Sequence, residues 1–94
     1  MSILKKIRQR ILNRDYYLSS HAEEEMLDDQ LNRKDIENAV LKGKVVKKLT
    51  QDARGTRYKI EGPSHNDREI GVVCRFTDEG TFVIITVYAI MEDK

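Results

Sequence analysis

The chain has 94 residues, of which 39% are hydrophobic and 35% are charged, and its formal net charge is +1. This length allows one domain, residues 1–94, with a single modest core. No apolar run reaches the roughly 18 residues that a membrane-spanning helix needs. The basic N-terminus lacks the apolar segment of a secretory signal, and the single cysteine, Cys74, has no disulfide partner in the chain. We therefore expect a cytoplasmic protein that does not use a membrane.

The small net charge conceals three segments of strongly biased charge. Residues 1–14 carry five basic side chains and no acidic one, whereas residues 15–29 carry six acidic side chains and no Lys or Arg. Residues 42–59 carry seven basic side chains and one acidic side chain. The overall charge therefore predicts nothing about nucleic-acid binding, but the local patches can form binding surfaces.

A first helix is predicted over residues 2–13, within an N-terminal extension at residues 1–14. Ile3, Ile7 and Ile11 recur at helical spacing, and Lys and Arg occupy the other side. We interpret this segment as an ordinary packing helix with a solvated basic face. The alternative is a helix that binds a membrane surface or a protein partner.

Residues 16–43 predict two further helices after a short link at residues 16–18. Two pairs of residues have the spacing of a capping box, in which each side chain bonds the other residue's backbone N–H. These pairs are Ser20 with Glu23, and Asn32 with Asp35. Gly43 suits the C-terminal end of the later helix.

From Lys44 onward apolar and polar residues alternate, which is the period of a β-strand. Four strands are predicted at residues 45–50, 56–61, 69–77 and 81–90. Turns are expected at residues 51–55, 62–67 and 78–80. Short connections favour antiparallel neighbours, so the predicted fold class is α+β, with helices on one face of a four-stranded antiparallel meander at residues 44–91.

The last predicted strand, residues 81–90, is uncharged and rich in β-branched residues, which is typical of a central strand. Alternation divides its side chains into two sets. One set is aliphatic and is expected to face the core: Val83, Ile85, Val87 and Ala89. The other set carries two hydroxyl groups and is expected on the opposite face: Phe82, Ile84, Thr86, Tyr88 and Ile90.

The predicted sheet face opposite the helices carries cations and hydroxyl groups on neighbouring strands. Its members are Arg57, Lys59, Arg75, Thr86 and Tyr88. Lys47 and Lys48 of the first predicted strand are further candidate RNA-binding residues. Guanidinium groups bind phosphate oxygens bidentately, and an aromatic ring can stack on an unpaired base. We therefore expect this face to bind RNA. The alternative is an ordinary solvent-facing sheet surface.

His21, at the start of the predicted second helix, is the candidate general base. RNA cleavage without a metal needs a base for the 2′-hydroxyl proton and cations for the charge that develops on phosphorus. The alternative is a polar residue that ties the helix to the sheet. His21, Glu24 and Glu25 lack a second histidine or a cysteine nearby, so no metal and no cofactor are predicted.

Several short motifs resemble a known bacterial family. They are Tyr17-x-x-Ser20-His21-Ala22-x-x-x-Met26, Asp35-Ile36, Gly43, Ile70-x-Val72-Val73 and Ile85-Thr86-Val87-Tyr88. Over residues 16–90 the chain resembles the family called domain of unknown function 4258, which is similar in layout to BrnT-type and RelE-type toxins. The resemblance implies a RelE-like fold and a metal-independent endoribonuclease that an antitoxin-like protein partner neutralises. The catalytic residues would be His21, Arg75, Thr86 and Tyr88.

The chain differs from such families after the His-Ala pair. Glu25 occupies a position where Arg is common, and Asp28 and Asp29 occupy a second basic position. Because carboxylates repel phosphate, a second hypothesis is a non-catalytic member that binds RNA or a protein partner. A third is a structural homodimer that uses Phe82, Ile84 or the first helix as its interface.

Overall fold

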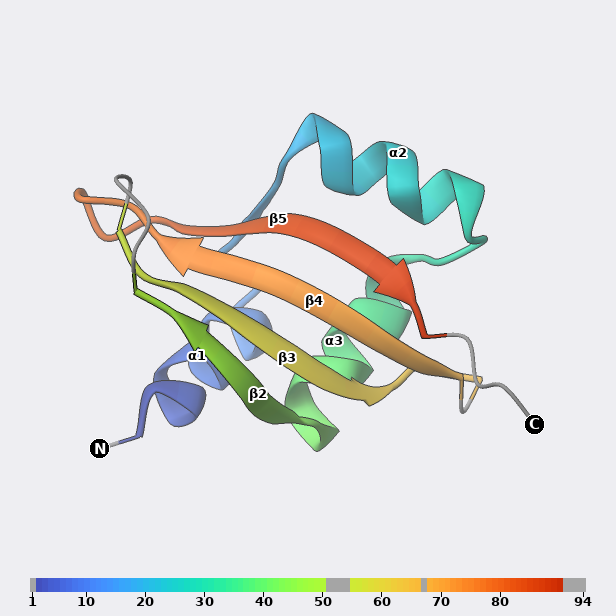
Figure 1. Ribbon diagram of the computed structural model, residues 1–94, viewed down its shortest axis with the longest axis horizontal. Helices are drawn as coiled ribbons and strands as arrows, with labels where there is room; N and C mark the ends of the chain where they lie inside the picture. The colour runs from blue at the N-terminus through green and yellow to red at the C-terminus, as the bar shows by residue number, and fades with distance from the viewer. Residues whose placement is uncertain (1, 51–54, 67, 91–94) are drawn as a thin grey trace.

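The computed structural model describes residues 2–50, 55–66 and 68–90. Its helices are α1 (Ile3–Leu12), α2 (Ser20–Asp28) and α3 (Arg33–Lys42). Its strands are β1 (Tyr17–Leu18), β2 (Lys44–Leu49), β3 (Arg57–Pro63), β4 (Glu69–Phe76) and β5 (Phe82–Ala89). The fold is α+β, as predicted, with α1 and α3 on one face of the sheet (Figure 1). Most of the predicted turn at residues 51–55 lies outside the described residues.

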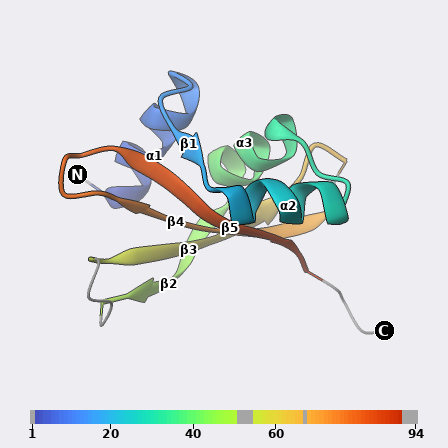
Figure 2. The same cartoon turned by 90° about the horizontal axis from the view of Figure 1, so that it is seen from above.

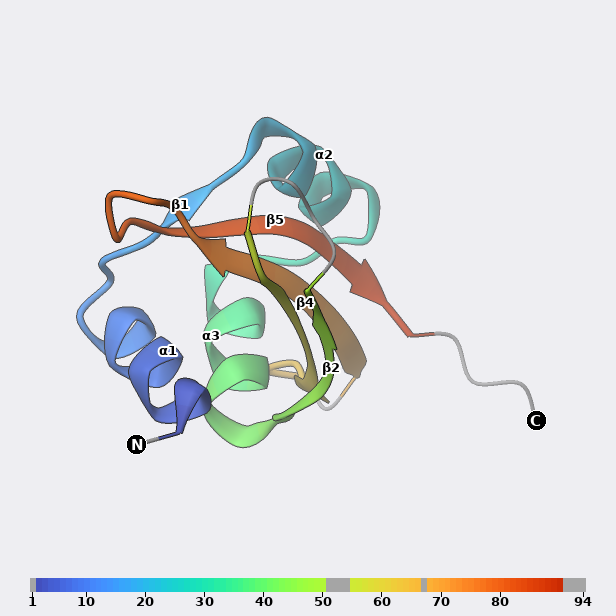
Figure 3. The ribbon, with the colours of Figure 1, turned by 60° about the vertical axis from the view of Figure 1, so that its left-hand side comes forward.

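The sheet of the described residues has five strands in the order β1-β5-β4-β3-β2 (Figure 3). Strands β2 to β5 form an antiparallel meander, as predicted. The prediction of a four-stranded, purely antiparallel sheet is wrong, because the expected link at residues 16–18 contains β1. Tyr17 and Leu18 pair in parallel with Val83 and Ile84 of β5. Two residues are too few to show a strand periodicity, so the sequence carries no sign of β1.

The start of α2 is fixed by Ser19 and not by the predicted Ser20. The Ser19 hydroxyl accepts a hydrogen bond from the Ala22 N–H at 3.0 Å. The Ser19 N–H donates to the Ile84 carbonyl in β5 at 3.0 Å, which holds Ser19 outside the helix. Glu23 therefore stands one position too late for the predicted capping box.

α3 begins with the predicted capping box of Asn32 and Asp35 and ends before Gly43. The φ angle of Gly43 is −88°, so a left-handed conformation is not the reason for glycine here. A Cβ at this position would overlap the carbonyl oxygens of Ala39 and Glu61. Gly43 therefore allows the end of α3 to lie directly against β3.

A β-bulge interrupts the alternation of β5. The Cα partners on its two sides are Val73 with Thr86, and Cys74 with Ile84. Ile85 is the extra residue, and the side chains before it point opposite to the predicted directions.

Because of the bulge, the predicted side-chain directions in the first half of β5 are wrong. Phe82 and Ile84 are fully buried, whereas Val83 and Ile85, which were expected in the core, are half-buried. Phe82 and Ile84 are therefore not available as a dimer interface. The side chains after the bulge were placed correctly: Val87 in the core, and Thr86 and Tyr88 on the opposite face.

α1 is a packing helix, as predicted, and lies beside α3 (Figure 2). Ile7 and Ile11 are buried. Arg8 donates hydrogen bonds from Nε to the Val40 carbonyl at 3.1 Å and from Nη2 to the Gly43 carbonyl at 2.7 Å. These bonds cap the C-terminal end of α3, where carbonyl groups lack helical partners.

The face of the sheet opposite α1 and α3 is not covered by any helix within the described residues, and we call it the open face (Figure 2). The sequence did not decide whether this face is accessible, because α1 could have packed on either side of the sheet. None of the helices in the described part of the chain is long and apolar enough to cross a membrane.

Candidate functional site

Three rows of residues that are Cα partners across the strands form most of the open face, and a fourth row contains Pro63 and Glu69. The first row contains Tyr17, Val83, Arg75, Arg57 and Leu49. The second row contains Thr86, Val73, Lys59 and Lys47. The third row contains Tyr88, Gly71, Glu61 and Lys44. Because paired residues present their side chains to the same side of a sheet, each row forms a continuous strip.

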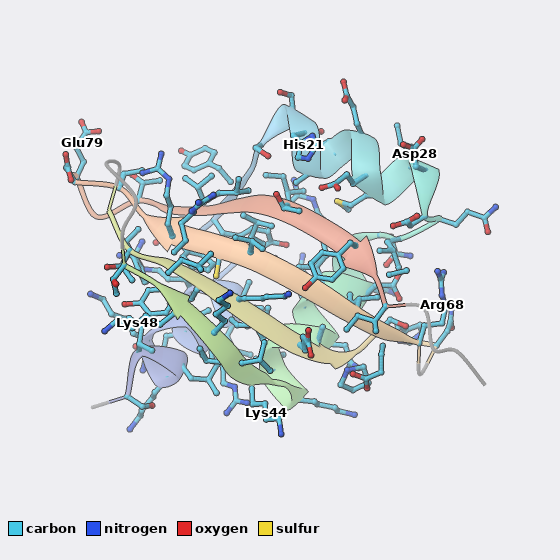
Figure 4. All side chains as sticks on the ribbon, viewed as in Figure 1. His21, Asp28, Lys44, Lys48, Arg68 and Glu79 are labelled. Atoms are coloured by element: carbon cyan, nitrogen blue, oxygen red, sulfur yellow. The ribbon has the colours of Figure 1, made fainter. Side chains whose placement is uncertain are left out.

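Six of the eight residues predicted for the site lie on this face: Lys47, Arg57, Lys59, Arg75, Thr86 and Tyr88. Lys48 does not, because its Cα partner is Tyr58, whose side chain packs against the core. Lys48, at the edge strand β2, therefore belongs to the other side of the sheet (Figure 4). His21 lies on α2 and not on the sheet.

Positive charge is concentrated in the first two rows. Arg57 lies directly opposite Arg75, and Lys47 lies directly opposite Lys59. Like charges in such positions repel one another. The two adjacent pairs produce a positive potential that favours an anion spanning several strands.

Tyr88 is less accessible than its place in the predicted strand suggested. Its ring lies over Gly71, where a Cβ would overlap the phenol carbons. The Lys59 Nζ lies 5.4 Å from the centre of the ring. The Tyr88 hydroxyl is buried, and its interaction with the Lys59 ammonium group raises the pKa of Lys59. Tyr88 therefore offers neither an open stacking surface nor an exposed proton donor in this arrangement.

Tyr17 is the exposed aromatic residue of the open face, and no local pattern in the sequence distinguishes it from Tyr16. Its relative exposure is 66%, and it ends the row that contains Arg75 and Arg57. The preceding Tyr16 is buried and donates its hydroxyl proton to Glu37 at 2.7 Å. Burial, together with this hydrogen bond, raises the pKa of Tyr16. The parallel pairing of β1 is what turns the two tyrosines to different environments.

His21 lies on α2 beside β5, at the rim of the open face (Figure 4). Its side chain is 63% exposed, and its Nε2 lies 3.4 Å from Oε1 of Glu25. The same Glu25 oxygen accepts a hydrogen bond from the Val87 N–H at 3.1 Å. An imidazole held by a carboxylate is a common arrangement for a general base. The bond from the helix to the sheet is made by Glu25, whereas the contact of His21 is with Glu25 in its own helix.

Two of the three acidic residues at the expected basic positions, Glu25 in α2 and Asp29 at its C-terminal cap, bind the backbone of β5. Glu25 accepts from the Val87 N–H, and Asp29 accepts from the Ala89 N–H at 3.2 Å. Residues four apart in a helix are separated by about 6 Å along its axis, close to the spacing of alternate residues in a strand. The two carboxylates thus satisfy the outer N–H groups of β5 beyond β1, where an unpaired strand edge would invite aggregation.

Cys74 is not a candidate nucleophile. It is fully buried, and burial raises the pKa of its thiol to about 12. The thiolate is the reactive form of cysteine, and it is scarce at neutral pH when the pKa is this high. Among the residues that the structure describes, no three His, Cys, Asp or Glu side chains are grouped to hold a metal ion.

One family model matches the chain over most of its length. A domain of unknown function (DUF4258) matches residues 18–89, which include α2, α3 and β2 to β5 but not α1 or Tyr17. No curated protein and no solved structure matches the chain. Because the match spans most of the sequence, the chain belongs to the DUF4258 family.

Proposed function

We propose that the protein binds single-stranded RNA on the open face of its sheet. The observation that carries this proposal is the row formed by Tyr17, Arg75 and Arg57. In this row the two guanidinium groups bind backbone phosphates and the exposed tyrosine ring stacks on a base. Lys59 and Lys47, in the neighbouring row about 7 Å away, extend the positive strip along the strands.

The proposal is tested by replacing the stacking residue. Tyr17→Ala is expected to weaken binding of a fluorescently labelled single-stranded RNA by about 5- to 150-fold, because stacking contributes roughly 1–3 kcal/mol per base. Tyr17→Phe retains the ring and is expected to bind like the wild type. Fluorescence anisotropy measures both affinities.

Leu12→Ala is the matched control, because Leu12 is similarly exposed, at 67%, but lies on α1 away from the open face. It is expected to leave the affinity unchanged. Equal affinity of wild type and Tyr17→Ala, with both folded by circular dichroism, would contradict the proposed stacking.

A second candidate function, metal-independent RNA cleavage, is favoured by the His21–Glu25 pair at the rim of this face. In this reaction His21 takes the 2′-hydroxyl proton, and the 2′-oxygen attacks the adjacent phosphorus. The bond to the 5′-oxygen breaks, that oxygen takes a proton from water, and a 2′,3′-cyclic phosphate remains. Arg75 stabilises the additional negative charge. This candidate function corresponds to the hypothesis of a ribonuclease similar to BrnT-type and RelE-type toxins, which an antitoxin-like protein partner neutralises.

Cleavage is tested with purified protein in the presence of EDTA. The wild type is expected to cleave RNA, and His21→Ala is expected to reduce the rate at least about 100-fold, the usual contribution of a general base. A substrate with 2′-deoxyribose throughout is the control, since it lacks the nucleophile. Absence of cleavage by the wild type would remove this candidate and leave RNA binding as the function.

A further inference from the structure

A hollow of about 340 Å³ lies between α2, β1 and the start of α3, beside the part of α2 that does not contact β5. Its apolar lining comes from Leu18, Met26, Leu27 and Leu31. Leu27 is 80% exposed, which is unusual for a leucine whose neighbours form an apolar hollow. The surface therefore presents both an apolar recess and a protruding apolar side chain.

The charges around this hollow have opposite signs on its two sides. On α2, Glu23 and Glu24 are exposed one turn before Leu27, and Glu23 lines the hollow. On the α3 side, Arg33 lines the same hollow. A second hollow of about 280 Å³ shares Arg33 and adds Arg14 and Lys34, together with Glu37. The α2 side is therefore acidic and the α3 side is mainly basic.

We propose that this surface is the interface of a two-fold symmetric homodimer. A two-fold rotation places α2 of each copy against the start of α3 in the other copy. Leu27 then enters the apolar hollow of the second copy, and the glutamates that flank it meet the basic side chains at the start of α3 there. An interface between identical copies must be complementary to itself, and a patch with an apolar centre and opposite charges on its two sides meets this condition.

A second copy of this chain has the features that fit the apolar hollow. The protruding element is a leucine preceded by two glutamates, and the recess is lined by leucines beside cations. This interface differs from the one that the sequence suggested, because it uses neither Phe82 nor Ile84 nor α1. The open face is left free, so RNA binding and dimer formation are tested separately. Because the apolar centre of the contact is one leucine in a hollow of about 340 Å³, we expect a concentration-dependent equilibrium rather than a permanent dimer.

Sedimentation equilibrium of the full chain tests the proposal. The average mass of the wild type is expected to rise from 11.0 kDa toward twice that value as the concentration increases to about 1 mM. Leu27→Asp is expected to remain monomeric over the same range. Leu12→Asp, which introduces the same charge at a similarly exposed leucine on α1, is expected to dimerise like the wild type.

Charge exchange tests the symmetry of the interface. Glu23→Lys with Glu24→Lys, and separately Arg33→Glu with Lys34→Glu, are each expected to be monomeric because like charges then face one another. An equimolar mixture of the two variants is expected to dimerise again, since opposite charges face one another once more. A monomeric wild type at about 1 mM, equal dimerisation of Leu27→Asp and Leu12→Asp, or a mixture that stays monomeric would each overturn the proposal.

Discussion

Reversing the two arginines of the first row, Arg57→Glu with Arg75→Glu, is expected to weaken single-stranded RNA binding by at least about 100-fold at 0.1 M salt. The two residues are Cα partners on the adjacent strands β3 and β4 of the open face. Their reversal removes both guanidinium groups that bind phosphate and adds repulsion at the same place. The dependence of affinity on salt should also decrease, by about 0.7 in the logarithmic slope for each phosphate that is no longer neutralised.

The matched control reverses two lysines on the helix-covered side, Lys5→Glu with Lys42→Glu. Both are exposed, Lys5 on α1 and Lys42 on α3, and their reversal changes the net charge by the same amount. Charges farther away than about 8–10 Å are largely screened at this ionic strength, so a change in affinity below about 3-fold is expected. Anisotropy titrations at several salt concentrations measure both variants. An equal weakening of binding in the two would mean that net charge, and not the open face, governs binding.

Gly62→Ala is expected to lower the free energy of unfolding by about 3 kcal/mol or more, enough to threaten a small domain. A Cβ at Gly62 would overlap the Ala39 carbonyl oxygen and would lie 2.7 Å from the Gly43 Cα. Both obstacles are backbone atoms, so α3 and β3 would have to separate. Urea denaturation measures the decrease in stability, and circular dichroism detects outright unfolding.

Gly80→Ala provides the comparison for this stability effect. Gly80 has a φ angle of +86°, and a Cβ there would have no neighbour within 4 Å. Alanine is therefore expected to cost only the strain of a left-handed backbone, about 1–2 kcal/mol. If both variants were destabilised equally, the close approach of α3 and β3 would not be what requires glycine at position 62.

The helices and the central strands could be predicted because their signals are local and regular. Ile70, Val72 and Cys74 recur at every second position of β4 and are all fully buried. The faces to which the side chains of β5 point could not be predicted in the same way. The residues from Phe82 to Ile85 are all apolar, so no polar residue marks Ile85 as the point where the alternation breaks.

The basic part of the site could also be predicted, because β3 and β4 pair without a bulge and keep Arg57 and Arg75 on one face. The outcome for Lys47 and Lys48 depended on tertiary structure. A register shift between Val45 and Lys47 determines which of two adjacent lysines faces the open side. Local sequence does not locate such a shift.

Tyr17 and the carboxylates of α2 were missed for a related reason. Tyr17 joins the open face through a parallel pairing with Val83, far away in the sequence. Glu25 and Asp29 bind N–H groups of β5 that follow them by 62 and 60 residues. Their charge looked unfavourable for phosphate binding, whereas their partners are backbone groups that composition cannot reveal.

The claim that RNA binds to the open face is tested most directly by side-chain NMR during a titration with single-stranded RNA. The Nε–H signals of Arg57 and Arg75 and the ring protons of Tyr17 are expected to shift and then saturate. Arg8, whose Nε donates to the Val40 carbonyl, and the buried ring of Tyr16 provide internal controls that should not move. Shifts at Arg8 and Tyr16, with Arg57, Arg75 and Tyr17 unchanged, would contradict binding at the open face.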